Sequence, residues 1–360
     1  MFVAWRDLKF AKGRFALMGT VVVLITLLVG LLSGLTAGLG QQNVSAITGL
    51  PADMIVFGGG GEKLSYADSA VTAGQQRQWA ATPGVAAAEP LGITTVKAAA
   101  GGKSTGVSAF GVEPGSSLAP DSGKLDDRSV VLSGPAADAL GLHPGDHVTL
   151  SGHELAVTAV GGDASFSHLP VIWTSLGTWR TLVPPAGDVT ATVLALTTSS
   201  DVDTVDTAAA DRAAGTRTVA TGDSLSAIGS YTSENGSLQL MRGFLFVISA
   251  LVVGAFFTVW TIQRSRDVAI LKALGAGTAT LVKDALGQAV VLLAGGTLIG
   301  TGLAVGLGAT LAGSAVPFRL DPGTVLVPAA VLIALGALGA VLAVRRITSV
   351  DPLTALGSAR

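Results

Sequence analysis

The sequence predicts an α-helical membrane protein with four transmembrane helices and a mixed α/β extracytoplasmic domain between the first and second helices. Three observations support this fold class. The 360 residues are 49% hydrophobic and only 13% charged, whereas a soluble domain usually carries about 25% charged residues, and the mean hydropathy is +0.61. Four uncharged stretches each reach the roughly 20 residues that a helix needs to cross a bilayer. Acidic and basic residues also concentrate in different parts of the chain.

One large insertion separates the first predicted transmembrane helix from the other three. The first apolar stretch is longer than the roughly 7–15 residues of a signal-peptide core, so we expect it to be retained. In chain order we expect an amphipathic cytoplasmic interface helix at 1–14, transmembrane helix 1 at 15–40, the extracytoplasmic domain at 41–240, transmembrane helix 2 at 243–263, a cytoplasmic coupling helix and loop at 264–284, transmembrane helix 3 at 285–313, transmembrane helix 4 at 323–344 and a cytoplasmic tail at 345–360.

The distribution of charge predicts the orientation of these segments. Residues 41–240 contain 19 Asp and Glu against 9 Lys and Arg, a net charge of −10. The rest of the chain contains 5 acidic and 13 basic residues, a net charge of +8. Lys and Arg concentrate in the short cytoplasmic loops of membrane proteins. Both termini and the 264–284 loop are therefore expected in the cytoplasm, and the acidic block outside the membrane.

The first 14 residues combine aromatic and basic side chains. Phe2, Trp5 and Phe10 are interspersed with Arg and Lys. This composition is typical of a helix that lies in the inner membrane interface, with aromatic rings toward lipid and cations toward headgroups. The alternative is a plain basic flank that only orients the first span.

The external block has the pattern of a mixed α/β domain. Turn sequences such as HPGD at 143–146 separate short segments rich in β-branched residues. Residues 140–161 predict two adjacent strands joined by a tight turn, in a small barrel or sandwich with a helix-rich lobe beside it. We expect strands at 92–99, 107–112, 128–134, 147–152, 153–162, 169–175 and 189–198, and helices at 66–82 and 201–214.

Glycines recur at four-residue spacing within two of the predicted spans. Such spacing lines one face of a helix with residues that allow another backbone to approach closely. We expect these faces at helix–helix contacts, within one chain or between two. They comprise Gly30, Gly34 and Gly38 in the first span, and Gly296 with Gly300 and Gly302 with Gly306 in the third.

The sequence lacks the motifs of several kinds of catalytic site. A phosphate-binding loop needs G-x-x-x-x-G-K-[ST], but the GGKS at 101–104 has Lys97 in the first position. There is no Cys, no G-x-S-x-G motif and no ionised residue near the centre of a span. We therefore expect no catalytic residue, metal or cofactor on this chain, and an external source of energy. We interpret the histidines as solvated turn residues, with a metal site at the first three as the alternative: His143, His147, His153 and His168.

Residues 266–276, RDVAILKALGA, predict a short amphipathic helix directly after the second span. Val268, Leu271 and Leu274 fall on one face at helical spacing, whereas the charged residues project elsewhere. A glycine follows, in the position that commonly ends a helix. This helix either lies on the lipid surface or provides a docking surface for a cytoplasmic partner.

Residues 264–288 resemble the signature of the FtsX/MacB superfamily of ABC transporter permeases, R-x-R-E-I-x-[IL]-x-[KR]-A-[LI]-G-A. Asp267 replaces Glu and Val268 replaces Ile. The segment 345–360 resembles the closing A-x-x-x-D-P-x-x-A-L-R of the family, with Gly357 where Arg is common. The order of one span, a large external domain and three further spans also agrees. The residues that match the first motif are Arg264, Arg266, Ile270, Lys272, Ala273, Leu274, Gly275 and Ala276.

The resemblance implies the permease of a type VII ABC transporter in a bacterial inner membrane. It further implies a permease homodimer held by two copies of a cytoplasmic ABC ATPase, which would bind the ATP and Mg²⁺. ATP-driven movement would pass to the external domain by mechanotransmission. Membrane lipid is an expected partner and nucleic acid is not. The residues expected to contact the ATPase are Arg264, Arg266, Asp267, Ile270, Leu271, Lys272, Leu274, Gly275 and Ala276.

Within the superfamily, the small size and the lack of an ATPase in these 360 residues favour the DevC/HrtB-like group. Residues 6–39 are similar to haem-efflux permeases of the HrtB type, so haem is the leading substrate. The alternatives are a permease for lipoproteins, lipids or peptides, and an FtsX-like activator of an extracytoplasmic cell-wall hydrolase that transports nothing. The residues expected to bind the substrate are Tyr231, Glu234, Met241, Met54 and Tyr66.

Overall fold

The structure, a computed structural model, describes residues 12–59, 63–182, 187–199, 205–263, 270, 277–311 and 316–348. The chain divides into two compact units. The α/β domain comprises residues 39–236, and the membrane unit comprises the described residues on either side of it. Two long helices, α2 (Lys12–Thr48) and α7 (Gly229–Gln263), contribute residues to both units.

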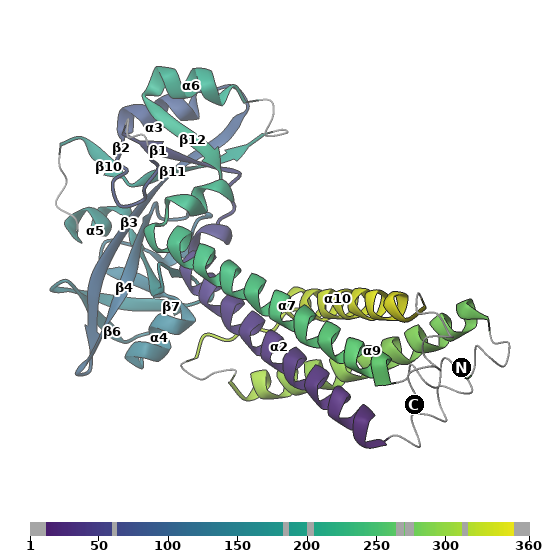
Figure 1. Cartoon of the computed structure of the whole chain (residues 1–360). Helices are drawn as coiled ribbons and strands as arrows, with labels where there is room; N and C mark the ends of the chain where they lie inside the picture. The colour runs from purple at the N-terminus through teal and green to yellow at the C-terminus, as the bar shows by residue number, and fades with distance from the viewer. Residues whose placement is uncertain are drawn as a thin grey trace. The chain divides into compact units, whose positions relative to one another are not determined.

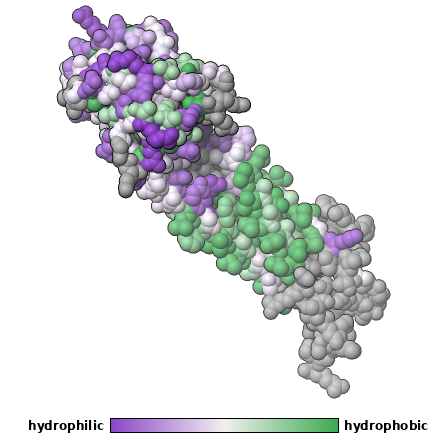
Figure 2. Space-filling view, turned by 90° about the horizontal axis from the view of Figure 1, so that it is seen from above, coloured by the Kyte–Doolittle hydropathy of each residue, from purple (hydrophilic) through white to green (hydrophobic). Residues whose placement is uncertain are grey.

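The membrane unit is built from α2, α7, α9 (Thr278–Leu311) and α10 (Pro322–Thr348). Among the described residues, these four helices each contain a segment of at least 21 residues that includes an 18-residue window with a mean hydropathy of 2.0 to 2.6. That length suffices to cross a bilayer. Figure 2 shows apolar residues over the visible surface of these helices and mainly polar residues over the α/β domain. Leu298, for example, is 73% exposed. Exposure of such an apolar side chain is favourable in lipid and unfavourable in water.

The helices that flank the α/β domain are longer than the predicted spans. The first helix continues to Thr48 rather than ending at 40, and α7 begins at Gly229 rather than at 243. Polar residues occupy both extensions, so hydropathy falls before the helix ends. The predicted interface helix at 1–14 and the predicted tail at 345–360 lie outside the described residues, apart from 12–14 and 345–348, which are helical.

Glycines allow close contact between α2 and α9. A Cβ atom added to Gly30 would lie 2.8 Å from the Cβ of Ala304, and one added to Gly300 would lie 2.6 Å from a backbone oxygen of α2. The predicted contact faces are confirmed for these glycines, and the contacts form within one chain. A Cβ added to Gly302 or Gly306 would meet nothing within 4 Å. These two glycines therefore make no such contact with the residues that the structure describes.

The connection between α9 and α10 packs back onto the first helix. Phe318 occupies the space that Cβ atoms at Gly34 and Gly308 would fill. The backbone N–H of Arg319 donates to the carbonyl of Gly34 at 3.1 Å. This connection therefore fixes one end of the helix packing. The apolar core of the membrane unit comprises Met18, Val22, Val253, Phe257, Ala289, Leu293 and Ala340.

The α/β domain contains ten strands in one continuous sheet and a separate two-stranded ladder. The strands are β1 (Met54–Gly58), β2 (Val71–Thr72), β3 (Val85–Ala100), β4 (Lys103–Val112), β5 (Ser129–Leu132), β6 (His147–Leu150), β7 (His153–Val160), β8 (Ser165–Phe166), β9 (Leu169–Ser175), β10 (Val189–Ala191), β11 (Val193–Thr198) and β12 (Thr216–Ala220). Strands are present in all the predicted segments, although the segment 189–198 contains two strands, β10 and β11, which belong to different sheets. The sequence did not predict β1, β2, β8 or β12.

The long strand β3 belongs to both a barrel and an open sheet (Figure 1). The barrel runs β3-β4-β9-β5-β7-β6 and closes where β6 pairs with the end of β3, at Ala98 opposite Leu150. The open sheet runs β12-β1-β11-β3 and uses the beginning of the same strand, at Leu91 opposite Val193. The predicted hairpin at 140–161 is confirmed, because β6 and β7 are antiparallel neighbours in the barrel.

Short helices cover both parts of the α/β domain. They are α3 (Ala73–Ala80), α4 (Gly134–Leu140), α5 (Leu176–Leu182), α6 (Thr207–Ala214) and the 3₁₀ turns Ser122–Lys124 and Asp223–Ala227. The predicted helix at 66–82 begins only at Ala73, because Thr72 and Gln75 form a capping box there. The predicted helix at 201–214 is described from Thr207 onward, while 201–204 lie outside the described residues.

The helix α5 packs a buried tryptophan, Trp179, against strands β3 and β4. Gly92 of β3 and Gly111 of β4 lie directly opposite each other in the sheet. A Cβ atom on either glycine would meet the side chain of Trp179. The paired glycines therefore leave a flat area on which the Trp179 side chain lies buried.

Candidate functional site

The β8–β9 hairpin contacts the end of α2 through its turn. Ser167 and His168 both have positive φ angles, 50° and 64°, as the two central residues of a type I′ hairpin turn require. Their backbone N–H groups donate to the carbonyls of Asn43 and Gln42, at 2.9 and 3.1 Å. The turn is therefore hydrogen-bonded to α2 through the main chain, independently of its side chains.

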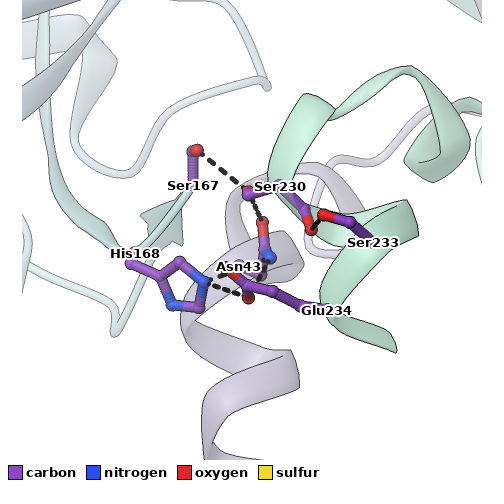
Figure 3. Close-up of polar contacts among 6 residues, drawn as sticks. All are labelled: Asn43, Ser167, His168, Ser230, Ser233 and Glu234. Atoms are coloured by element: carbon purple, nitrogen blue, oxygen red, sulfur yellow. Dashed lines mark hydrogen bonds and ion pairs between the residues drawn. The ribbon is translucent and has the colours of Figure 1, made fainter. Parts of the chain in front are cut away.

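A buried asparagine joins this hairpin to α7. Asn43 is only 1% exposed. Its amide nitrogen donates to Oε2 of Glu234 at 3.2 Å, and its carbonyl oxygen accepts from the Ser230 hydroxyl at 2.9 Å. Ser230 and Glu234 are four residues apart in the first turns of α7, so they share one helix face. Figure 3 shows the Asn43 side chain pointing toward both of them.

The imidazole of His168 completes the arrangement. Its Nε2 atom lies 2.5 Å from Oε2 of Glu234 and 3.2 Å from the amide nitrogen of Asn43. Because an ionised carboxylate can only accept, the contact with Glu234 is a hydrogen bond in the tautomer whose Nε2–H donates to Oε2. The Ser167 hydroxyl lies 3.1 Å from that of Ser230. These five residues, Asn43, Ser167, His168, Ser230 and Glu234, are called the Asn43 cluster below.

The Asn43 cluster is only partly accessible to water. The side chains of His168 and Glu234 are 29% and 44% exposed, so their attraction is partly screened, whereas Asn43 is buried. The expectation of a solvated turn histidine is therefore wrong for His168, although it describes the exposed His143 well. In the described part of the chain, no group of three His, Cys, Asp or Glu could hold a metal ion.

The Asn43 cluster connects three elements of the α/β domain. It contains no nucleophile activated by a base and no open metal position. It ties the end of α2, the start of α7 and the β8–β9 hairpin together at one place. Strand β9 lies inside the barrel sheet, between β4 and β5. The cluster therefore joins both helices to a strand of the barrel.

The structure brings only one of the five expected substrate-binding residues into this cluster. Glu234 is a member, and Tyr231 lies one turn earlier on α7, where it packs partly buried against the domain core. Met241 lies on the same helix but in the membrane unit, where it is exposed. Met54 is buried in β1.

Tyr66 lies in the core of the α/β domain rather than at the end of a span. Its ring packs edge-on against Phe57 and Phe166, at centroid distances of 4.9 and 5.5 Å. Its hydroxyl donates to Ser224 at 2.8 Å. Burial raises the pKa of Tyr66 above its usual value, although the bond to Ser224 opposes this shift. The side chains of Tyr66 and Met54 are therefore closed to a ligand in this structure.

Most of the residues expected to contact the ATPase lie outside the described residues. These are Arg264, Arg266, Asp267, Leu271, Lys272, Leu274, Gly275 and Ala276. The remaining one, Ile270, is described as helical and exposed.

Two family matches cover most of the chain. Residues 15–213 match the MacB-like periplasmic core domain, and residues 240–352 match the FtsX-like permease C-terminal region. The first match spans α2 and most of the α/β domain, and the second spans the last three membrane helices. The extracellular domain of YknZ, a noncanonic ABC-type transporter from Gram-positive bacteria, aligns with 46% of this chain and 98% of its own length, at a TM-score of 0.35 and 15% identity.

Several relatives are similar along their whole length. Permeases named for hemin transport, HrtB, from Staphylococcus epidermidis and Staphylococcus haemolyticus are 24% and 26% identical, with 99% of each chain covered. An uncharacterized ABC transporter permease of Mycobacterium tuberculosis is 24% identical over 369 residues, again covering 99% of both chains. This chain is thus a multi-pass membrane permease with an extracytoplasmic α/β domain, and it belongs to the FtsX/MacB family of ABC transporter permeases.

Proposed function

We propose that this permease works as a homodimer bound by two cytoplasmic ABC ATPases, and that it extracts an amphipathic substrate from the membrane by mechanotransmission. Haem is the leading substrate. Both termini and the 264–284 loop face the cytoplasm in this proposal, as the net charge of +8 outside residues 41–240 favours. ATP hydrolysis occurs on the partner, and this chain converts the resulting movement into work on the extracytoplasmic side.

The observation that carries the proposal is the continuity of α2 and α7. The first of these has 37 residues, which corresponds to roughly 55 Å at 1.5 Å per residue. An α-helix satisfies its backbone hydrogen bonds internally, so a push at one end is transmitted to the other without large internal rearrangement. Both helices end in the α/β domain at the Asn43 cluster, which bonds them to each other and to the barrel.

The expected ATPase contact follows α7 without interruption in the sequence. The helix ends at Gln263, and the family motif begins at the next residue. Movement of the 264–276 segment would therefore act on α7 directly. We expect Leu271→Asp and Gly275→Pro to abolish ATPase stimulation by the permease in reconstituted complexes. Thr310→Ala, which alters an exposed residue outside 264–288, should leave the stimulation intact. Full stimulation in both motif variants would contradict the coupling role.

Haem is supported by the hemin-transport names of full-length relatives and by the chemistry of α7. Tyr231 and Glu234, which carry oxygen atoms that can bind iron, are three residues apart on one face of the helix, and Met241 follows on the same helix. Glu234 already accepts from His168 and Asn43. Ligation of haem iron by Glu234 would therefore compete with the Asn43 cluster and connect substrate binding to the force-transmitting contacts.

A hemin titration in lipid nanodiscs tests the substrate. We expect a saturable Soret shift for the complex with its ATPase, weakened about tenfold or more by Tyr231→Phe combined with Glu234→Gln. The matched control is Thr232→Ala, which alters an exposed residue between them. A flat titration with the ATPase present would remove haem as the substrate and leave the family assignment unchanged.

A transport assay separates this proposal from the hydrolase-activator alternative. Inside-out vesicles containing the complex should accumulate hemin in their lumen in an ATP-dependent manner, because the lumen corresponds to the extracytoplasmic side. An FtsX-like activator would instead show ATP-dependent stimulation of a cell-wall hydrolase with no movement of hemin or of lipid-linked cargo.

A further inference from the structure

The α/β domain contains a cleft of about 420 Å³. It lies between the end of α2, the loop that follows β4 and the loop between β7 and β8. Leu50, Leu118, Ala119 and Trp173, which line it, are nearly buried and form part of the domain's main apolar core. Its volume is within the range of small-molecule sites, which are typically apolar with a few polar groups. The Asn43 cluster contributes none of its lining residues.

Hydrogen bonds hold the walls of this cleft in place. The Ser45 hydroxyl of α2 bonds to the backbone of Ser165, accepting from its N–H at 2.8 Å and donating to its carbonyl at 3.2 Å. The carbonyl of Gly162 accepts from the backbone N–H of Gly134 at 2.8 Å. On the opposite side, the hydroxyl of Ser116 accepts from the N–H of Leu118 at 3.1 Å. The cleft therefore has fixed walls and is not a gap between unsupported loops.

One charge determines what the cleft can accept. Among its described lining residues, Asp163 is the only one that ionises. Its side chain is exposed and has no hydrogen-bond or ion-pair partner within the described part of the chain. An unpaired carboxylate beside an apolar surface attracts a cation that donates hydrogen bonds and repels an anion.

We propose that this cleft binds a small amphipathic cation. Its apolar body would pack against Leu118 and Trp173, and its ammonium or iminium N–H would donate to the carboxylate of Asp163. Haem, with two anionic propionates, has the wrong charge for this site. The proposal is therefore independent of the substrate proposed above, and the cleft provides a separate recognition site on the extracytoplasmic side of the membrane.

Two dyes with the same ring system provide the test. Rhodamine 6G is a cation with two N–H donors, and fluorescein is an anion of similar size. Fluorescence anisotropy is measured with the full-length protein in nanodiscs of zwitterionic lipid, after subtraction of the signal from empty nanodiscs. We expect saturable binding of rhodamine 6G at one site per chain and no saturable binding of fluorescein. Excess hemin should not displace rhodamine 6G.

Three variants locate the binding. Asp163→Asn removes the charge with little change of shape and should weaken rhodamine 6G about tenfold, because the charge-assisted hydrogen bond is lost. Ser117→Trp fills the cleft from an exposed rim position and should abolish binding. Asp138→Asn, an exposed carboxylate on α4 outside the cleft, is the matched control and should change nothing.

Unchanged affinity in Asp163→Asn would overturn the proposal, as would equal binding of the two dyes or the absence of a saturable component in the unmodified protein. Asp163→Asn alters an exposed side chain without a structural partner, so its result stands even if Ser117→Trp fails to fold. Failure of hemin binding would remove the haem proposal and leave this one untouched.

Discussion

The Asn43 cluster can be tested by placing a second carboxylate inside it. In Asn43→Asp, an oxygen replaces the amide nitrogen that lies 3.2 Å from Oε2 of Glu234. Two unit charges at that distance repel by about 5 kcal/mol at an effective dielectric constant of 20 and by about 1.3 kcal/mol in water. Because Glu234 is 44% exposed, we expect a screened cost of about 1 to 3 kcal/mol in local stability.

Hydrogen–deuterium exchange of the full-length protein measures this cost where it arises. The backbone amides of residues 165–175 and 229–236 should exchange roughly 5- to 150-fold faster in Asn43→Asp than in the unmodified protein, because local opening is easier. Adding Glu234→Gln should restore slow exchange, because the pair again contains one carboxylate and one amide. Asn235→Asp adds the same charge to α7 at a position next to the cluster and should have little effect. If Asn43→Asp behaves like Asn235→Asp, or if the double variant is no slower, the reasoning fails.

Three further predictions concern packing and pH. Trp179→Ala should lower the free energy of unfolding of the α/β domain by about 3 to 5 kcal/mol, measured by exchange in β3 and β4, because a buried indole leaves a cavity. Gly300→Leu should prevent recovery of monodisperse protein in detergent, whereas Gly302→Leu, with open space around it, should purify normally. Burial raises the pKa of Tyr66 in the folded protein. The stability that neutral Tyr66 contributes is therefore complete at pH values below the pKa of about 10 in the unfolded chain, and it declines as the pH rises above that value. Thermal unfolding of Tyr66→Phe should therefore lose part of this alkaline sensitivity, at a cost of about 1 kcal/mol at neutral pH from the lost bond to Ser224; an identical pH profile would contradict this.

The parts of the fold that depend on local pattern could be predicted from the sequence. The four spans follow from uninterrupted apolar stretches, and the hairpin at 140–161 follows from alternation on either side of a turn. Gly300 was expected at a helix contact, because the four-residue spacing of glycines can be recognised in the sequence alone. Its neighbour Gly302 has the same pattern but meets only open space, because the pattern does not specify which face has a partner.

The Asn43 cluster could not be predicted, because its members are far apart in the chain. Asn43 lies 125 residues before His168 and 191 residues before Glu234. Asn43 and Glu234 come together because α2 and α7 continue as helices into polar sequence. A hydropathy pattern does not predict that continuation. Glu234 was selected only for its position near a span. His168 resembles any turn histidine until the type I′ turn and its contact with α2 are known.

The sharing of β3 between two sheets has a consequence for how the external domain can move. Val85–Ala100 is a single uninterrupted strand. Its first half pairs with β11 of the open sheet, and its second half pairs with β4 of the closed barrel. The two ladders meet at Leu91 and Gly92 without overlapping, so a bend of β3 at this point would break neither of them. It would break the hydrogen bonds that Thr192 makes to Leu91 and Ile93 across the junction. A movement that enters the barrel at the β8–β9 hairpin would therefore reach the open sheet through a short hydrogen-bonded junction in β3.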